Sequence, residues 1–243
     1  MYTETKTRTV IKTVSWRFWA TVTTTALVFL FIGKPEVALS IGAIEVILKL
    51  VIYFFHERVW ANIKFGKSEI EPFVVWLTGL SRSGKTEVAE ILSQKMKKFG
   101  LKVQHLDGHN VRTIFTEAGF NKNEVNEHIK RVGYLASILE KQGIFVIASF
   151  LSPYAEARNF VRNLSNNFVE VYVSTPLEVC KKRDKSELYE KAIKGEVQNL
   201  PGINAPYEKP ENPEITIDTD ELTFEEAAEQ IFNYLHKFIK NGY

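Results

Sequence analysis

Two long apolar stretches near the start of the chain contrast with shorter apolar runs in the rest of it. Residues 18–33 read FWATVTTTALVFLFIG without a charge, and a second apolar stretch covers residues 37–56. A helix that crosses a bilayer needs roughly 17–25 mostly apolar residues. The pattern therefore predicts a hairpin of two transmembrane helices around the turn Gly33-Lys34-Pro35-Glu36. After residue 72, β-type runs alternate with helical patterns, which predicts an α/β domain.

The second apolar stretch carries two charges, Glu45 and Lys49. A charge in the middle of a membrane costs about 3 kcal/mol on insertion scales. A spacing of four places both side chains on one helical face, where they can pair with each other or face a neighbouring chain. We expect an assembly contact, and thus a homo-oligomer, rather than a transport path. A hairpin lying on the membrane surface and a buried globular hairpin are the alternatives. No small-residue cleavage site of a secretory signal precedes the second stretch.

Basic residues flank the predicted hairpin on both outer sides. They are Lys6, Arg8, Lys12 and Arg17 before the first helix and Arg58, Lys64 and Lys67 after the second. Positive charge marks the cytoplasmic side of a membrane helix. The sequence thus predicts a multi-pass protein of the inner or plasma membrane with both termini in the cytoplasm and with the lipid bilayer as a partner.

Charge supports a division into domains at residues 1–67 and 72–243. Residues 1–67 hold 9 Lys+Arg and 4 Asp+Glu, whereas residues 68–243 hold 22 and 25. The whole chain of 243 residues carries a net charge of +2, so no excess of positive charge indicates a nucleic-acid partner. Its one cysteine, Cys180, cannot form an internal disulfide and reads as a packed small hydrophobe.

A phosphate-binding motif follows the predicted strand Phe73–Thr78. The motif is Gly79-Leu80-Ser81-Arg82-Ser83-Gly84-Lys85-Thr86, which fits G-x-x-x-x-G-K-[ST]. The apolar residues behind it recur at helical spacing up to Gly100. In such a loop backbone N–H groups surround phosphate oxygens, the lysine bridges the β- and γ-phosphates, and the threonine hydroxyl binds Mg²⁺. The motif predicts a three-layer P-loop NTPase fold with a mainly parallel sheet, binding ATP and Mg²⁺ through Lys85 and Thr86.

The next predicted strand, Val103–Leu106, ends at Asp107. A carboxylate at the carboxyl end of a strand faces the ligand crevice of an open α/β sheet, where it can anchor a magnesium-bound water or accept a hydroxyl proton. Arg112 could clamp an anionic acceptor. These features favour a small-molecule kinase. Residues 121–124 read Asn-Lys-Asn-Glu, superficially like a guanine-reading motif, but they end in Glu and follow a Gly-Phe turn, so we interpret them as a coincidence.

Residues 72–235 resemble adenylyl-sulfate kinase over their whole length. Besides the P-loop, the shared motifs are Leu106-Asp107-Gly108-x-Asn110-Val111-Arg112, Gly119-Phe120, Arg131-Val132-Gly133, Ser149–Tyr154, Thr175–Cys180, Arg183-Asp184, Leu188-Tyr189, Gly195-Glu196, Gly202-Ile203, Pro206–Glu208 and Pro210–Glu214. The resemblance implies an ATP-dependent kinase that phosphorylates the 3′-hydroxyl of adenylyl sulfate in sulfate assimilation. Residues 1–67 resemble a small, uncharacterised two-helix membrane domain, which implies no activity.

The resemblance also implies roles for individual residues. Phe120 would stack on the adenine of the acceptor, Arg112 would hold its phosphosulfate, Leu151 and Ser152 would line its pocket, and Arg183 would belong to a mobile lid on the ATP side. Ser152 matches a position known in the family as a phosphoserine, but direct transfer to an oriented hydroxyl needs no such step. We therefore interpret Ser152 as a substrate contact.

The departures from the family pattern lie where the acceptor should bind. They are His109 for an Asp, Val125 for an Arg, His128 for an Asn, Ser186 for a lid Lys, and Leu200 for an aromatic residue. Each could weaken binding by roughly 1–3 kcal/mol. Two alternatives to the family reaction follow. One is a kinase for a related nucleotide conjugate, with His109 and His128 in its changed recognition site, and the other is a nucleotide-binding membrane scaffold without activity.

Overall fold

The computed structural model describes residues 2–4, 6–31, 35–63, 67–69, 71–114 and 119–240. The chain folds into two compact units, one made of residues 2–70 and one made of residues 71–240. Of the predicted turn Gly33-Lys34-Pro35-Glu36, the first two residues lie outside the described residues, as does Lys64, and the last two belong to the first turn of the helix Pro35–Asn62.

The first unit is a helical hairpin with a short two-stranded sheet. Its elements are β1 (Tyr2–Glu4), α1 (Lys6–Phe31), α2 (Pro35–Asn62) and β2 (Lys67–Glu69). Strands β1 and β2 pair antiparallel, with Thr3 opposite Ser68. The predicted helix pair is confirmed, and both helices extend beyond the apolar stretches into the charged flanks.

Polar side chains between α1 and α2 explain this extension. Arg8 is 1% exposed and donates hydrogen bonds to the carbonyl oxygens of Trp60 and Ile63, which belong to the last turn of α2 and the residue after it. Lys12 Nζ lies 2.7 Å from Glu57 Oε1. These contacts satisfy terminal carbonyl groups of α2 and pair a charge that the hairpin partly buries.

Large apolar side chains cover the outer surface of the hairpin. Phe18, Leu30, Leu50 and Phe55 are all more than 60% exposed. Measured by hydropathy over the residues that the structure describes, neither α1 nor α2 contains a run long and apolar enough to cross a membrane. The side chain of Glu45 lies outside the described part of the chain, so its pairing with Lys49 stays a prediction.

The second unit is built on a five-stranded parallel sheet with the order β4-β5-β3-β6-β7. The strands are β3 (Val74–Gly79), β4 (Val103–Asp107), β5 (Phe145–Ser149), β6 (Phe168–Val173) and β7 (Ile215–Ile217). All six residues of the central strand β3 are buried, as a strand covered on both faces requires. The predicted parallel sheet is confirmed.

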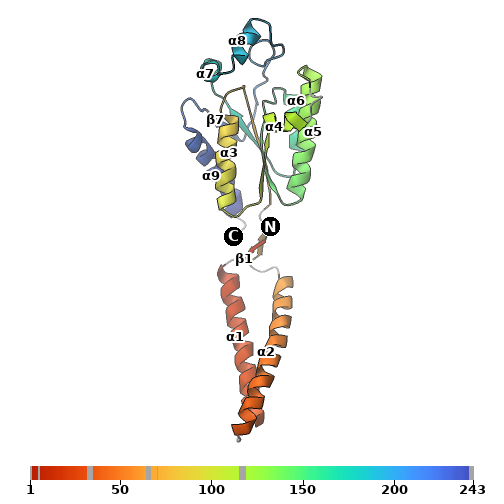
Figure 1. Ribbon diagram of the computed structural model, residues 1–243, viewed down its shortest axis with the longest axis vertical. Helices are drawn as coiled ribbons and strands as arrows, with labels where there is room; N and C mark the ends of the chain where they lie inside the picture. The colour runs from red at the N-terminus through yellow and green to blue at the C-terminus, as the bar shows by residue number, and fades with distance from the viewer. Residues whose placement is uncertain are drawn as a thin grey trace. The chain divides into compact units, whose positions relative to one another are not determined.

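Helices cover both faces of this sheet (Figure 1). The helices of this unit are α3 (Lys85–Lys98), α4 (Gly108–Ile114), α5 (Lys122–Lys141), α6 (Ala155–Leu164), α7 (Leu177–Arg183), α8 (Leu188–Ile193) and α9 (Phe224–Lys240). Helices α3 and α9 pack together on one face, and α5 and α6 pack together on the other. Helices α7 and α8 lie beyond the carboxyl ends of the strands.

The core on the α5 and α6 side centres on Trp76 of β3, which is fully buried. Its ring stacks on Phe150 at 5.4 Å and on Phe168 at 6.4 Å between centroids. Glutamate and arginine side chains close the edge of this core, with Arg158 Nε 2.8 Å from Glu170 Oε1. The core therefore reaches the segment that follows β5, because Phe150 belongs to it.

Candidate active site

A cavity of about 750 Å³ opens at the carboxyl end of the sheet. Its lining comes from the loop and helix start after β3, the start of α4 after β4, Phe120 and the first half of α5, residues 149–154 at and after the end of β5, Leu188, and residues 197–201. Loops after neighbouring parallel strands meet at this edge of an open sheet, which is the usual place for a ligand. The cavity gathers the predicted residues Lys85, Thr86, Asp107 and Arg112.

The loop between β3 and α3 needs glycine at two places. A Cβ added to Gly79 would lie 2.5 Å from the carbonyl oxygen of Val173, and one added to Gly84 would lie 2.6 Å from the ring of Phe224. Gly84 also has φ +88°, a left-handed conformation that side chains rarely adopt. The loop thus turns tightly against the strand β6 and helix α9 and directs the amino end of α3 at the cavity.

Lys85 is buried at the floor of the cavity, 8% exposed. Its Nζ donates to the carbonyl oxygen of Leu80 at 2.5 Å and to Ser83 Oγ at 3.2 Å. Burial lowers the pKa of Lys85 from 10.5 to about 8, although nearby Cys180, Glu87 and Asp107 favour the charged form. The ammonium is held inside its own loop by weak neutral acceptors, which a phosphate oxygen can replace.

Thr86 and Asp107 supply oxygen ligands that suit Mg²⁺. Thr86 Oγ1 donates to Asp107 Oδ2 at 2.9 Å, and both residues line the cavity. Among the residues that the structure describes, no three acidic, histidine or cysteine side chains gather into a metal cluster. Magnesium typically takes one or two protein oxygens and completes its shell with phosphates and water, so this pair fits the ion.

Asp107 receives four hydrogen bonds. Its Oδ1 accepts from the backbone N–H groups of His109 at 3.0 Å and Asn110 at 3.2 Å, and its Oδ2 accepts from Thr86 and, at 3.2 Å, from Ser149 Oγ. Burial raises the pKa of Asp107, but these hydrogen bonds outweigh burial and hold it below its usual value. The carboxylate is therefore ionised at neutral pH and fixed in orientation.

Arg112 and Phe120 form a stacked pair in the lining of the cavity. The Arg112 guanidinium carbon lies 4.0 Å from the centre of the Phe120 ring, and Arg112 also donates to the carbonyl oxygen of Gly119 at 2.5 Å. Phe120 is 62% exposed. A cation and an exposed aromatic face at one place can recognise an anionic ligand that carries a planar base.

His128 lies buried beside this pair and lines the cavity. Burial, followed by the charges of Arg112 and Arg131, lowers the pKa of His128, so its imidazole is neutral at pH 7. His109 is exposed on α4 and also lines the cavity. Both histidines thus lie where acceptor recognition was predicted. Val125, Leu151 and Leu200 are also in the lining.

Ser152 is 2% exposed and has φ +35°. Its hydroxyl accepts a hydrogen bond from Trp76 Nε1 at 3.1 Å and donates to Thr78 Oγ1 at 2.9 Å. Tyr207 Oη lies 3.0 Å from the same Thr78 oxygen. The hydroxyl of Ser152 is therefore engaged by the core, and its residue lines the cavity as part of a loop that the strand β3 holds in place.

Arg183 lies away from the lining of the cavity. It donates to Thr219 Oγ1 at 2.7 Å and to the Thr219 carbonyl oxygen at 2.6 Å, and its guanidinium lies 5.7 Å from the Phe224 ring. Ser81, Arg82, Gly84, Lys85 and Thr86 line the cavity, whereas Gly79, Leu80 and Ser83 of the same loop do not.

Three observations of this site escaped the sequence analysis. Ser149 was read only as part of a motif, and nothing pointed to His105, whose Nε2 lies 2.9 Å from Ser149 Oγ. The alternation of side chains along a strand could have found His105, because it lies two residues before Asp107 on the same face. Asn121 and Glu124 form a capping box at the start of α5, which gives residues 121–124 a structural purpose.

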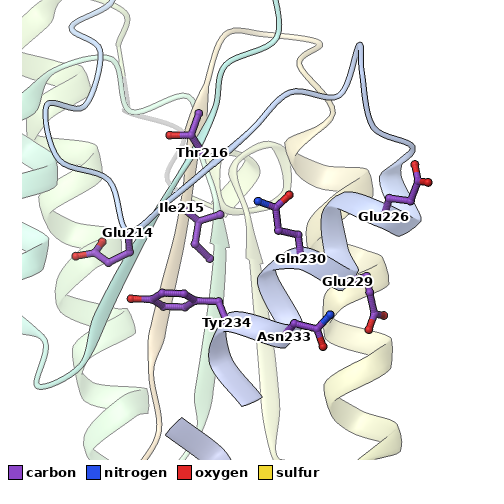
Figure 2. Close-up of a pocket in the computed structure, with 8 residues that line it drawn as sticks. All are labelled: Glu214, Ile215, Thr216, Glu226, Glu229, Gln230, Asn233 and Tyr234. Atoms are coloured by element: carbon purple, nitrogen blue, oxygen red, sulfur yellow. The ribbon is translucent and has the colours of Figure 1, made fainter. Parts of the chain in front are cut away.

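A second hollow of about 610 Å³ lies between β7 and α9 (Figure 2). Its lining includes three glutamates, but Arg162 holds Glu214, and Lys95 pairs with Glu229. Glu226 accepts hydrogen bonds from Thr223 at the start of α9. These carboxylates serve the packing of the domain, and we assign them no ligand.

Comparison with family models gives two matches. Residues 71–218 match the model described as adenylylsulphate kinase. Residues 10–61 match the model described as predicted membrane protein (DUF2061).

Individual relatives agree with the first match. An adenylyl-sulfate kinase of Thermodesulfovibrio yellowstonii is 46% identical over 173 residues, covering 70% of this chain and 86% of the relative. An adenylyl-sulfate kinase of Halothermothrix orenii is 44% identical over 164 residues, covering 67% of this chain and 89% of the relative. Among solved structures, the Mycobacterium tuberculosis APS kinase CysC in complex with AMPPNP and APS is similar, with a TM-score of 0.66, 34% identity, and coverage of 69% of this chain and 99% of that chain.

Proposed function

The chain belongs to the adenylyl-sulfate kinase family, and on this premise we propose that it transfers the γ-phosphoryl group of ATP to the 3′-hydroxyl of adenylyl sulfate. The product is 3′-phosphoadenylyl sulfate. One observation carries the proposal: a single cavity is lined by the phosphate-binding loop, by Asp107 and by the Arg112–Phe120 pair. A nucleoside triphosphate and a second, anionic nucleotide can therefore meet in the cavity that Asp107 lines.

The loop at Gly79–Thr86 holds the triphosphate. Its backbone N–H groups and the amino end of α3 face the phosphates, and Lys85 Nζ exchanges its bonds to Leu80 and Ser83 for γ-phosphate oxygens. A buried ammonium that gains a phosphate partner returns toward its fully charged form. Lys85 then stabilises the charge of the group in transfer.

Asp107 orients the acceptor hydroxyl and takes its proton as the oxygen attacks the γ-phosphorus. The four donors around its carboxylate keep it ionised and in one orientation. Thr86 and Asp107 are the residues that would hold Mg²⁺, which neutralises charge on the β- and γ-phosphates when bound. Positioning and electrostatics supply most of the catalysis of a phosphoryl transfer.

The acceptor lies against the Arg112–Phe120 pair in the cavity. The exposed face of Phe120 stacks on its base, and Arg112 binds its anionic group. His128 offers a neutral imidazole from the buried side, and Leu151 closes the pocket. Arg183 lies outside the lining of the cavity, beside Phe224, so its role on the ATP side stays a prediction.

The test is an assay of the full-length protein with ATP, Mg²⁺ and a panel of nucleotide acceptors. Formation of 3′-phosphoadenylyl sulfate from adenylyl sulfate, with a higher kcat/KM than for any other acceptor, is the expected result. Preference for another nucleotide conjugate would replace the acceptor and keep the kinase. ATP binding without transfer to any acceptor would reject the reaction in favour of a scaffold.

For the hairpin we propose attachment to a membrane as a pair of transmembrane helices, with both ends on the cytoplasmic side. The proposal rests on the whole apolar stretches 18–33 and 37–56, which include residues outside the described part of the chain that the hydropathy measure covers. The apolar outer surface at Phe18, Leu30, Leu50 and Phe55 supports this arrangement, as does the match of residues 10–61 to a predicted membrane protein. Polar side chains such as Arg8 and Lys12 lie between the helices and are partnered there, which leaves the apolar side chains to the lipid.

Extraction of cell membranes at alkaline pH tests the membrane proposal. A protein anchored by transmembrane helices stays in the membrane pellet, whereas a protein bound to the surface appears in the supernatant. Protease treatment of inside-out vesicles should degrade the kinase unit if it faces the cytoplasm. Release by alkali, or protection in these vesicles, would contradict the proposed placement.

A further inference from the structure

Asp107 is hydrogen-bonded to Ser149, and Ser149 is hydrogen-bonded in turn to His105, a residue to which the proposed reaction assigns no part. Ser149 on β5 lies opposite Asp107 on β4 in the register of the sheet, and its hydroxyl donates to Asp107 Oδ2 at 3.2 Å. His105 lies two residues before Asp107 on β4, so both side chains occupy the same face of the strand. Its Nε2 lies 2.9 Å from Ser149 Oγ.

The number of available protons decides which group donates in each of the two hydrogen bonds that link His105, Ser149 and Asp107. A serine hydroxyl carries one proton and two lone pairs, and an ionised carboxylate only accepts. If Ser149 gives its proton to Asp107, the contact with His105 is a hydrogen bond only when Nε2 carries a proton and donates. That condition holds for the Nε2–H form of neutral histidine and for the protonated ring alike. The alternative, Ser149 donating to His105, would turn an oxygen lone pair toward the Asp107 carboxylate.

We propose that His105 is a positioning residue for Asp107. By donating its Nε2–H to Ser149 Oγ, His105 leaves the proton of the Ser149 hydroxyl for the Asp107 carboxylate. The adjacent positions of the three residues on β4 and β5 make this possible. The proposal rests on the proposed function in one respect, namely that Asp107 orients the acceptor hydroxyl. His105 itself does not line the cavity. Its hydrogen bond toward the site is therefore the one to Ser149.

The kinetic test uses the full-length protein with His105→Leu and His105→Gln. Leucine removes the donor, whereas the glutamine amide can still donate to Ser149. We expect His105→Leu to lower kcat for adenylyl sulfate phosphorylation about tenfold, as loss of an orienting hydrogen bond to a functional group does, while the KM for ATP stays within about twofold. His105→Gln should recover most of kcat. Wild-type kcat in His105→Leu, or equal losses in both variants, would overturn the proposal.

A double-mutant cycle tests the route through Ser149. In the background of Ser149→Ala, the change His105→Leu should cause no further loss of kcat, because the two residues act in series. Losses that multiply would show that His105 acts elsewhere and would reject the proposal.

A spectroscopic readout separates this proposal from the proposed function. Nitrogen NMR of histidine-labelled wild-type protein reports which ring nitrogen of His105 is protonated, with or without turnover. We expect Nε2 to carry the proton in the wild type and a mixture of tautomers in Ser149→Ala. A wild-type ring protonated on Nδ1 alone would overturn the proposal even if the enzyme is active. An enzyme inactive on adenylyl sulfate but with the expected tautomer would overturn only the proposed reaction.

Discussion

Tyr189 Oη of α8 donates a 2.7 Å hydrogen bond to the carbonyl oxygen of Ser81 in the phosphate-binding loop. A second link joins the same two segments, since Arg82 Nη2 donates to Ser186 Oγ at 3.0 Å and Arg82 Nε lies 3.4 Å from Asp184. Burial raises the pKa of Tyr189, so its hydroxyl stays protonated and donates over the whole physiological range. These two hydrogen bonds and the ion pair tie residues 184–189 to the phosphate-binding loop, and we call them the latch.

Tyr189→Phe should loosen this latch and weaken ATP binding. The variant loses one hydrogen bond and keeps the buried ring, so we expect the KM for ATP to rise about two- to tenfold, the equivalent of about 0.5–1.5 kcal/mol. The KM for the acceptor should change less. Tyr134→Phe is a matched control, because Tyr134 is 60% exposed on α5. An unchanged KM for ATP in Tyr189→Phe would show that the latch does not support the loop.

Lys85→Met should abolish turnover and stabilise the fold. The pKa of Lys85 is lowered by burial from 10.5, its value in water, to about 8 in the folded protein, so the unfolded chain binds more protons between these values. Stability of the wild type therefore rises with pH across that window, and below pH 8 burial of the charge costs about 3 kcal/mol.

Urea unfolding of both proteins from pH 7 to pH 10.5 checks this expectation. The advantage of Lys85→Met in free energy of unfolding should be largest at pH 7 and should shrink as the pH rises toward 10.5. A pH-independent difference would contradict the shifted pKa, and retained phosphoryl transfer would contradict the role of Lys85.

The phosphate-binding end of the site could be predicted because its chemistry is local. The loop Gly79–Thr86 is contiguous in sequence, and the strand and helix around it follow from the hydrophobic pattern. The geometry of the phosphate-binding loop can therefore be predicted from the motif alone. Asp107 followed from its place at the end of a strand. The contact between Thr86 and Asp107 then results from two parallel βα units whose strands, β3 and β4, lie on either side of β5.

Contacts between distant segments could not be read in the same way. Trp76 and Ser152 are in contact because β3 and β5 are neighbours in the order β4-β5-β3-β6-β7. The residue pattern of a single strand does not predict which strand pairs with it. The helices of the hairpin extend past their apolar stretches because Arg8 and Lys12 find partners across the hairpin. Hydropathy along a single segment carries no information about such pairing.

Ser152→Ala tests whether this hydroxyl is a phosphate carrier or a structural group. We expect kcat to stay within about threefold of the wild type, because direct transfer to an oriented hydroxyl needs no covalent intermediate. Stability should fall by about 1–3 kcal/mol, since the buried Trp76 Nε1 loses its acceptor. Trp76→Phe combined with Ser152→Ala should cost less than the sum of the single changes. A loss of kcat beyond about a thousandfold in a folded Ser152→Ala protein would favour a phosphoserine.

Arg112→Lys tests recognition of the acceptor. Lysine keeps the charge but loses the planar guanidinium that stacks on Phe120 at 4.0 Å and donates to Gly119. We expect the KM for adenylyl sulfate to rise about tenfold, as loss of a charged hydrogen bond predicts, with the KM for ATP within about twofold. Arg58→Lys is the matched control, because Arg58 lies 5.4 Å from the Phe54 ring in the hairpin and should leave both constants unchanged. A rise in the KM for ATP instead would place Arg112 on the triphosphate side of the cavity.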